Sequence, residues 1–422
     1  MAGPRRVGWI AVALVASTLA CSSSSDDDGG SGAPDATESA EVAGEVAIAV
    51  TPAVARADEP LEVTIEGLPA DTEATLVVTS TDDAGRSWTS EAEVRVGDDG
   101  TVDPDDATTA TTDLLATLQP DDGEDGLYVW GRDAGTFTVD VRGDGGAEAT
   151  AEVERSLVGA GVQDRPTTLD EEGFVGHLWS PPDAAAETEP GAAIVLLAGS
   201  EGGLGGAFEA PLLAAHGHPA LQLGLFGLPG LPENLDSIPL ETVADALRWL
   251  GQQPGVDPER LWVLGGSRGS EAALLVGAHF PELVAGVVAT VPSSAVNCAL
   301  PACDGSAWTL DGAPLPYAPG LVPYPPEAAI PVELIDGPVH TTCGDDDTLW
   351  GSCLYVNAII ARRGTEADDD IHTPGPTSGH GVGIIAPQVV AGDIPAFASG
   401  DPVPDEAVRL EAWTALLEAL AA

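Results

Sequence analysis

The segment that decides the fold reads Leu261-Trp262-Val263-Leu264-Gly265-Gly266-Ser267-Arg268-Gly269-Ser270. Its apolar start predicts a strand over Leu261–Leu264, and the residues from Ser267 to Phe280 predict a helix. A Gly-x-Ser-x-Gly sequence between a strand and a helix is typical of a nucleophile elbow. Gly265 and Gly269 let the neighbouring chain pass close to the serine, and the helix aims its free N–H groups at a developing oxyanion.

Strands and helices alternate on both sides of this segment. The predicted strands are Phe174–Trp179, Ala192–Leu197, Ala220–Phe226, Val284–Val291 and Pro338–Thr342, and the predicted helices are Leu240–Gln252, Leu354–Arg363 and Ala407–Leu420. Continuous apolar strands that alternate with helices indicate a parallel sheet covered on both faces. We therefore expect an α/β hydrolase, with a doubly wound and mostly parallel sheet, over residues 165–422.

The preceding residues, 42–155, follow a different pattern. Short strands are predicted at Glu45–Thr51, Leu61–Ile65, Glu73–Thr79, Trp88–Val96 and Thr136–Val141, separated by Gly, Pro and Asp turns. This spacing favours an all-β sandwich of the immunoglobulin-like type. The region contains no His and no Cys. We therefore expect no catalytic set in it.

The first residues have the pattern of an export signal. Arg5 and Arg6 precede an apolar stretch that ends near Leu19, and Cys21 follows Ala20 directly. This arrangement resembles the lipobox of bacterial lipoproteins, in which the Cys is lipidated. We expect residues 1–20 to be a lipoprotein signal peptide, and residues 21–41 a disordered Ser/Asp/Gly tether. The protein would then be extracytoplasmic and anchored to the cell membrane through Cys21; a plain signal peptide with an incidental Cys is the alternative.

The charge balance restricts the partners. The chain of 422 residues has 15 basic residues, all of them Arg, against 68 acidic ones, which gives a formal net charge of −53. Such an acidic surface repels nucleic acid and opposes a polyanionic substrate, while it keeps the protein soluble. We expect no nucleic-acid partner.

Four cysteines remain once Cys21 is set aside: Cys298, Cys303, Cys343 and Cys353. An even number in an exported chain favours disulfides. Proximity in the sequence favours Cys298–Cys303 and Cys343–Cys353, although three pairings are possible. A four-Cys zinc site is the alternative, but the spacings are irregular for one.

A serine needs a general base and an acid to become a nucleophile at neutral pH. In this fold they follow the chain order Ser, acid, His. Asp347 lies just past the predicted strand Pro338–Thr342, three residues after Gly344, and Asp346 is its competitor. For the base we expect His380, in a Gly-flanked loop before the closing helix. His279, His340 and His372 lie in a helix or in predicted strands instead.

The oxyanion hole should combine two backbone N–H groups. One is expected from Arg268, the residue after the nucleophile. The other is expected from the Gly-rich loop Ser200–Gly206, where Gly202 is the candidate donor. No P-loop Lys, Ser or Thr follows that loop, so a phosphate-binding role is not favoured.

Several of these motifs are similar to those of one family. Gly266–Glu271, Val291–Ser294, Leu231–Glu233, Gly344–Trp350 and Gly379–Gly381 resemble segments of the acyl-CoA thioesterase and bile acid-CoA:amino acid N-acyltransferase family. The resemblance implies an immunoglobulin-like domain before an α/β hydrolase, a triad of Ser267, Asp347 and His380, and an acyl thioester substrate. The nucleophile of the transferases is Cys, so Ser267 resembles the hydrolase branch and implies water as the acyl acceptor.

The expected function is therefore a serine hydrolase that cleaves a small-molecule acyl thioester or ester. No metal or organic cofactor is implied. An acyltransferase to an amine or alcohol is one alternative. A non-catalytic cell-surface binding module on a hydrolase scaffold is another, against which the complete Ser, acid and His set argues.

Overall fold

The computed structural model describes residues 45–182, 190–319, 323–364, 367, 369–389, 392–393 and 402–422. One compact unit extends from Ala43 to Ala422. The expected signal peptide, the tether and Cys21 lie outside the described residues. Within the described ranges, no helix combines the length and the hydropathy needed to cross a bilayer.

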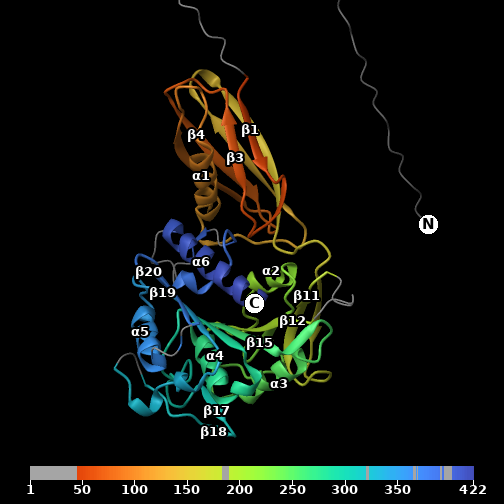
Figure 1. Ribbon diagram of the computed structural model, residues 1–422, viewed down its shortest axis with the longest axis vertical. Helices are drawn as coiled ribbons and strands as arrows, with labels where there is room; N and C mark the ends of the chain where they lie inside the picture. The colour runs from red at the N-terminus through yellow and green to blue at the C-terminus, as the bar shows by residue number, and fades with distance from the viewer. Residues whose placement is uncertain are drawn as a thin grey trace, which may run out of the picture. The chain divides into compact units, whose positions relative to one another are not determined.

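An eight-stranded sheet forms the centre of the carboxy-terminal region (Figure 1). In spatial order its strands are β10 (Gln163–Thr167), β11 (Val175–Ser180), β13 (Ala220–Gly224), β12 (Gly191–Leu197), β15 (Val256–Gly266), β16 (Gly286–Thr290), β19 (Val339–Gly344) and β20 (Ile371–Gly375). The strands from β13 to β20 pair in parallel, and β10 and β11 add an antiparallel edge. The expected α/β-hydrolase fold is confirmed, and its sheet begins at Gln163, just before the expected boundary.

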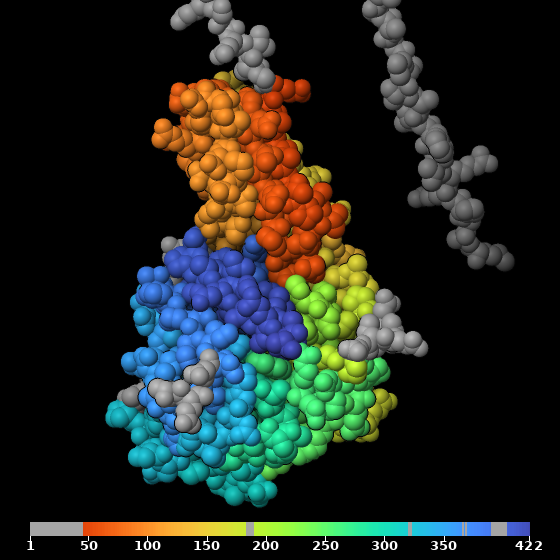
Figure 2. Space-filling model, in the orientation of Figure 1, coloured from red at the N-terminus to blue at the C-terminus, as the bar shows by residue number. Residues whose placement is uncertain are grey.

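Helices cover both faces of this sheet. They are α2 (Glu209–Ala215), α3 (Glu241–Leu250), α4 (Arg268–His279), α5 (Ser352–Arg363) and α6 (Pro402–Ala421). Alternate residues of β12 enter different cores: Val195 packs with α3 and α4, whereas Ile194 packs with α2 and α6. This is why β12 is apolar at nearly every position. Figure 2 shows α6, in dark blue, at the surface of the molecule.

The region before this sheet is rich in strands but also contains a helix. Strand β1 (Ala47–Thr51) pairs with β3 (Glu62–Glu66), and a six-stranded sheet has the order β2 (Val54–Arg56), β9 (Glu148–Ser156), β8 (Gly135–Arg142), β4 (Glu73–Thr81), β5 (Ser87–Arg95) and β6 (Gln119–Pro120). One core joins both sheets and includes the buried Trp88 and Phe137. The all-β expectation was wrong for residues 104–116, which form α1 (Pro104–Ala116) against β3 and β5.

The structure gives a physical reason for α1. Asp103 caps its start by accepting the N–H of Asp105, and Pro104 occupies the first turn, where its missing N–H is not needed. Asp105 and Asp106 place negative charge at the positive end of the helix dipole. Leu114 and other apolar residues then bury one side of the helix in the core between the sheets.

The long segment after β16 contains short elements of its own. Strand β17 (Trp308–Leu310) pairs with β14 (Ile238–Pro239) and with β18 (Ala313–Pro314). A further short pair joins β7 (Gly126–Leu127) to β21 (Gly392–Asp393). The first set ties the excursion to the segment before α3, and Trp308 of β17 joins the core that contains residues of α3 and α4.

Buried polar contacts connect the β-rich region to the hydrolase region. The carboxylate of Asp58 accepts the indole N–H of Trp413 in α6 at 3.0 Å and lies 2.5 Å from Nε2 of His216. Arg155 of β9 donates to the side-chain oxygen of Gln388 at 2.7 Å. Because these groups are buried, breaking one contact would leave a polar atom with neither a protein partner nor water to hydrogen-bond. The contacts therefore hold the two regions in a specific register.

Candidate active site

Ser267 occupies a strained turn between β15 and α4. Its backbone has φ 52° and ψ −119°, a conformation that costs free energy for a residue with a Cβ. The flanking glycines make the turn possible. A Cβ on Gly265 would lie 2.2 Å from the carbonyl oxygen of Gly269, and one on Gly269 would lie 2.5 Å from that of Ala198. The geometry is that of a nucleophile elbow, as the sequence predicted.

Asp347 and His380 are in direct contact. Oδ2 of Asp347 lies 2.8 Å from Nδ1 of His380, and both side chains are buried. The other carboxylate oxygen of Asp347 accepts the backbone N–H of Leu349 at 3.0 Å and that of Trp350 at 3.3 Å. Asp346 is exposed on the same loop. Of the two candidate acids, Asp347 is the one that contacts the imidazole.

The loop that carries His380 is held from several sides. Thr290 donates to the carbonyl of Gly383 at 2.7 Å, and Arg409 of α6 donates to the carbonyl of Ile384 at 3.2 Å. The ring of Trp350 lies edge-on to the imidazole, with ring centroids 5.9 Å apart. These contacts hold the loop in place, and Trp350 packs against the imidazole.

A cavity of about 270 Å³ opens beside the elbow. Ser267 and His380 both line it, so the nucleophile candidate and the base candidate face the same space. The competing histidines lie elsewhere. His340 packs against Trp262 inside the sheet, where burial lowers its pKa to about 4, and His372 contacts Thr341 at 2.8 Å. The structure thus places Asp347 in contact with His380, and His380 and Ser267 on the lining of one cavity.

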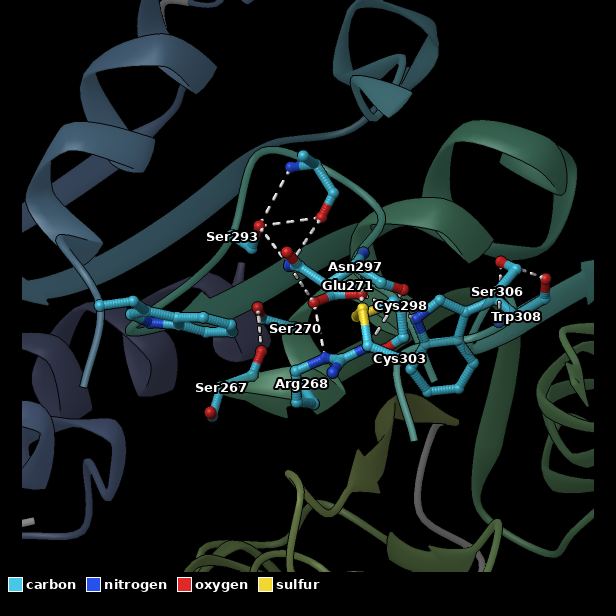
Figure 3. A network of polar contacts seen from close by, with 12 residues as sticks. Ser267, Arg268, Ser270, Glu271, Ser293, Asn297, Cys298, Cys303, Ser306 and Trp308 are labelled. Atoms are coloured by element: carbon cyan, nitrogen blue, oxygen red, sulfur yellow. Dashed lines mark hydrogen bonds and ion pairs between the residues drawn. A yellow bond between two sulfur atoms is a disulfide. The ribbon is translucent and has the colours of Figure 1, made fainter. Parts of the chain in front are cut away.

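A buried ionic network lies behind the elbow (Figure 3). Glu271 of α4 is fully buried, and its carboxylate lies 2.8 Å from Nε of Arg268. It also accepts the indole N–H of Trp308 at 2.9 Å and the side-chain amide of Asn297 at 2.7 Å. Figure 3 shows the hydroxyl of Ser267 pointing away from this network. The side chain of Arg268 is therefore held by this network. Its backbone N–H lies at the start of α4, next to Ser267.

The structure does not support Gly202 as the second oxyanion donor. The N–H of Gly202 donates to the carbonyl of Gly199 at 3.4 Å, and its Cα faces the ring of Phe226. Gly202 does not line the cavity, whereas Gly199, Glu201 and other residues of this loop do. Gly202 has a left-handed φ of 69°, which the turn itself requires. In a sequence, a glycine required by a turn cannot be distinguished from a glycine that binds a ligand.

Both expected disulfides are present. Cys343 bonds to Cys353 across the loop that carries Asp347, and Cys298 bonds to Cys303 in the segment that contacts Arg268. Within the described residues, no group of three or more His, Cys, Asp or Glu side chains could hold a metal ion. The cysteines therefore act in the structure as covalent ties around the site.

Two carboxylates in the cavity escaped the sequence reasoning. Glu209, in the first turn of α2, is buried, which raises its pKa, and it accepts the N–H of Ile385 at 3.1 Å. Glu201 is exposed and accepts the N–H of Gly199 at 2.9 Å. The sequence feature that could have indicated Glu209 is a single Glu at the start of an otherwise apolar helix. Glu201 interrupts the glycines of the Ser200–Gly206 loop, which was the signal for that residue.

Known proteins are similar in sequence to this chain. Residues 58–168 match the family described as acyl-CoA thioester hydrolase/BAAT N-terminal region. Acyl-coenzyme A thioesterase 1 of Mus musculus is 27% identical over 405 residues, which cover 85% of this chain and 92% of that protein. Over most of its length the chain is therefore similar to the acyl-CoA thioesterase and N-acyltransferase family. The match to residues 58–168 extends from the β-rich region into β10, so the family pattern joins both regions.

Both branches of the family are among the relatives. Acyl-coenzyme A amino acid N-acyltransferase 1 of Mus musculus is 28% identical over 242 residues, and the match covers 51% of this chain and about half, 53%, of that protein. A putative dienelactone hydrolase from Klebsiella pneumoniae aligns with 62% of this chain and 98% of its own, at a TM-score of 0.43 and 15% identity. The similarity to thioesterases and to an N-acyltransferase therefore leaves the acyl acceptor open.

Proposed function

We propose that this protein is a serine hydrolase that cleaves an acyl thioester or ester through an acyl-enzyme on Ser267. The observation that carries the proposal is the 2.8 Å contact between Asp347 and His380, in a site where His380 and Ser267 line one cavity. Further support comes from the thioesterases among the relatives. A buried acid, an imidazole and a hydroxyl on a strained turn are together the parts that acyl transfer needs.

In this mechanism, His380 accepts the proton of Ser267 as the hydroxyl attacks the acyl carbon. Asp347 orients the imidazole through Nδ1 and stabilises the imidazolium that forms. The backbone N–H of Arg268 donates to the oxyanion, and His380 then protonates the leaving thiol or alcohol. Water attacks the acyl-enzyme with His380 as the base, which releases the carboxylic acid and restores Ser267.

The acyl acceptor separates hydrolysis from transfer. Ser267 as nucleophile favours water, because the transferases that this chain resembles use Cys. The test is a panel of p-nitrophenyl esters and acyl thioesters with wild type and Ser267→Ala, with and without added glycine. The proposal expects free carboxylic acid as the product, at a rate that the substitution abolishes. Acyl-glycine as the main product would favour an N-acyltransferase, and no turnover by wild type of any substrate would favour a binding module.

The site of action is part of the same proposal. Cys21 after an apolar leader supports a lipid anchor outside the cytoplasm. Metabolic labelling with an alkyne fatty acid should modify wild type and leave Cys21→Ala unlabelled. Labelling of neither chain, with both secreted, would favour an ordinary signal peptide.

A further inference from the structure

A carboxylate stands beside the candidate nucleophile. Oε1 of Glu201 accepts the N–H of Gly199, and its other oxygen lies 2.7 Å from the point that a Cβ on Gly199 would occupy. The Cβ of Ser267 lies 3.3 Å from the same point. The Glu201 carboxylate and the Ser267 side chain are thus on the same side of Gly199, and both line the cavity.

Among the described residues that line the cavity, no basic side chain balances Glu201. None of the described residues that line the cavity is Arg, and the chain has no Lys. Arg268 is paired with Glu271 behind the elbow, and Arg409 lies near Asp405 and Glu406 while it donates to the His380 loop. The remaining lining is largely glycine and apolar side chains. In the part of the chain that the structure describes, the carboxylate side chains of this lining are those of Glu201 and Glu209.

A carboxylate beside the nucleophile opposes the reaction of an ordinary acyl group. The oxyanion that forms at the acyl carbon would be repelled by Glu201, which raises the barrier for neutral substrates and more so for anionic ones. A cation on the substrate would reverse that effect. The acyl group is the part of the substrate that stays on Ser267 through both half-reactions, so a cation on it would meet Glu201 in both transition states.

We propose that the cavity selects acyl thioesters or esters whose acyl group carries an ammonium group, with Glu201 as the specificity-determining residue. This inference rests on the proposed function, since it assigns a substrate class to the same site. It also accounts for an acidic residue in a loop where glycine is otherwise the rule. The leaving group is not restricted by it.

A matched pair of substrates tests the inference. The p-nitrophenyl esters of 4-(trimethylammonio)butyrate and of 5,5-dimethylhexanoate have the same shape and differ by one positive charge. After each kcat/KM is divided by the rate of hydroxide-catalysed hydrolysis, wild type should prefer the cationic ester by about fivefold, as expected for one exposed charge pair. Glu201→Gln should reduce this ratio to about one, and high salt should reduce it in wild type.

The control variant is Glu282→Gln, which removes one negative charge from an exposed 3₁₀ helix that does not line the cavity. It should keep the wild-type ratio. An equal ratio in wild type and Glu201→Gln would overturn the inference, with Glu201 then serving only to hold Gly199. The proposed function is tested separately: wild type should hydrolyse the neutral ester, and Ser267→Ala should not. A failure of the inference is therefore distinguishable from a failure of that function.

Discussion

Glu271→Gln is the substitution with the most specific expected outcome. The Glu271 carboxylate is fully buried and faces Arg268, whose side chain is only 6% exposed. Glutamine would keep one oxygen but would place an NH₂ group against donors from Asn297 and Trp308. It would also leave the guanidinium buried without a counter-charge. Removal of one partner of a buried ion pair costs about 3–5 kcal/mol, so the free energy of unfolding should fall by that amount.

The assay is urea denaturation followed by tryptophan fluorescence, with the disulfides kept oxidised. The double variant Arg268→Gln/Glu271→Gln removes both charges and lets two amides pair, so it should be more stable than Glu271→Gln alone. Glu282→Gln, an exposed control, should lie within about 0.5 kcal/mol of wild type. A loss below about 1 kcal/mol for Glu271→Gln, or a double variant less stable than the single one, would refute the reasoning.

Three further changes test separate parts of the site. Asp347→Asn should lower kcat for a p-nitrophenyl ester by about 10⁴-fold. Asp346→Asn, at an exposed position, should leave kcat nearly unchanged. The opposite result would assign the role of the triad acid to Asp346. Replacing both Cys343 and Cys353 by Ala should lower the free energy of unfolding by about 2–3 kcal/mol, the loop-closure value for a sequence separation of 10; no change in the urea midpoint would contradict this. Burial raises the pKa of Glu209, so wild type keeps its full stability below the ordinary Glu pKa of about 4.3 and loses part of it as pH rises. Glu209→Gln should therefore gain in Tm over wild type from acid to neutral pH, and a pH-independent difference would argue against a buried ionisable group.

The parts of the site that could be predicted follow from local sequence. A parallel strand buried on both faces must be apolar throughout, so β12 and the core of β15 were visible as apolar runs. The elbow was visible because only glycine fits at Gly265 and Gly269, where the chain passes within van der Waals distance of itself. The order of acid and base along the chain then selected Asp347 and His380.

The parts that were missed depend on contacts between distant segments. The role of Glu209 exists only because α2 lies beside the end of the His380 loop, 176 residues further along the chain. Gly202 could not be told from a binding glycine, because a left-handed turn and an oxyanion loop require the same residue. Helix α1 was hidden by its threonines, which favour strands, although its Asp–Pro–Asp start is a capping signal.

The central claim is that Ser267 becomes covalently acylated with His380 as its base. The most direct measurement is mass spectrometry of peptides after reaction with a fluorophosphonate probe, for wild type and His380→Ala. We predict a single adduct on Ser267 in wild type, with none on the adjacent Ser270, and labelling slowed by orders of magnitude in His380→Ala. An unlabelled Ser267, or equal labelling rates in the two proteins, would contradict the account.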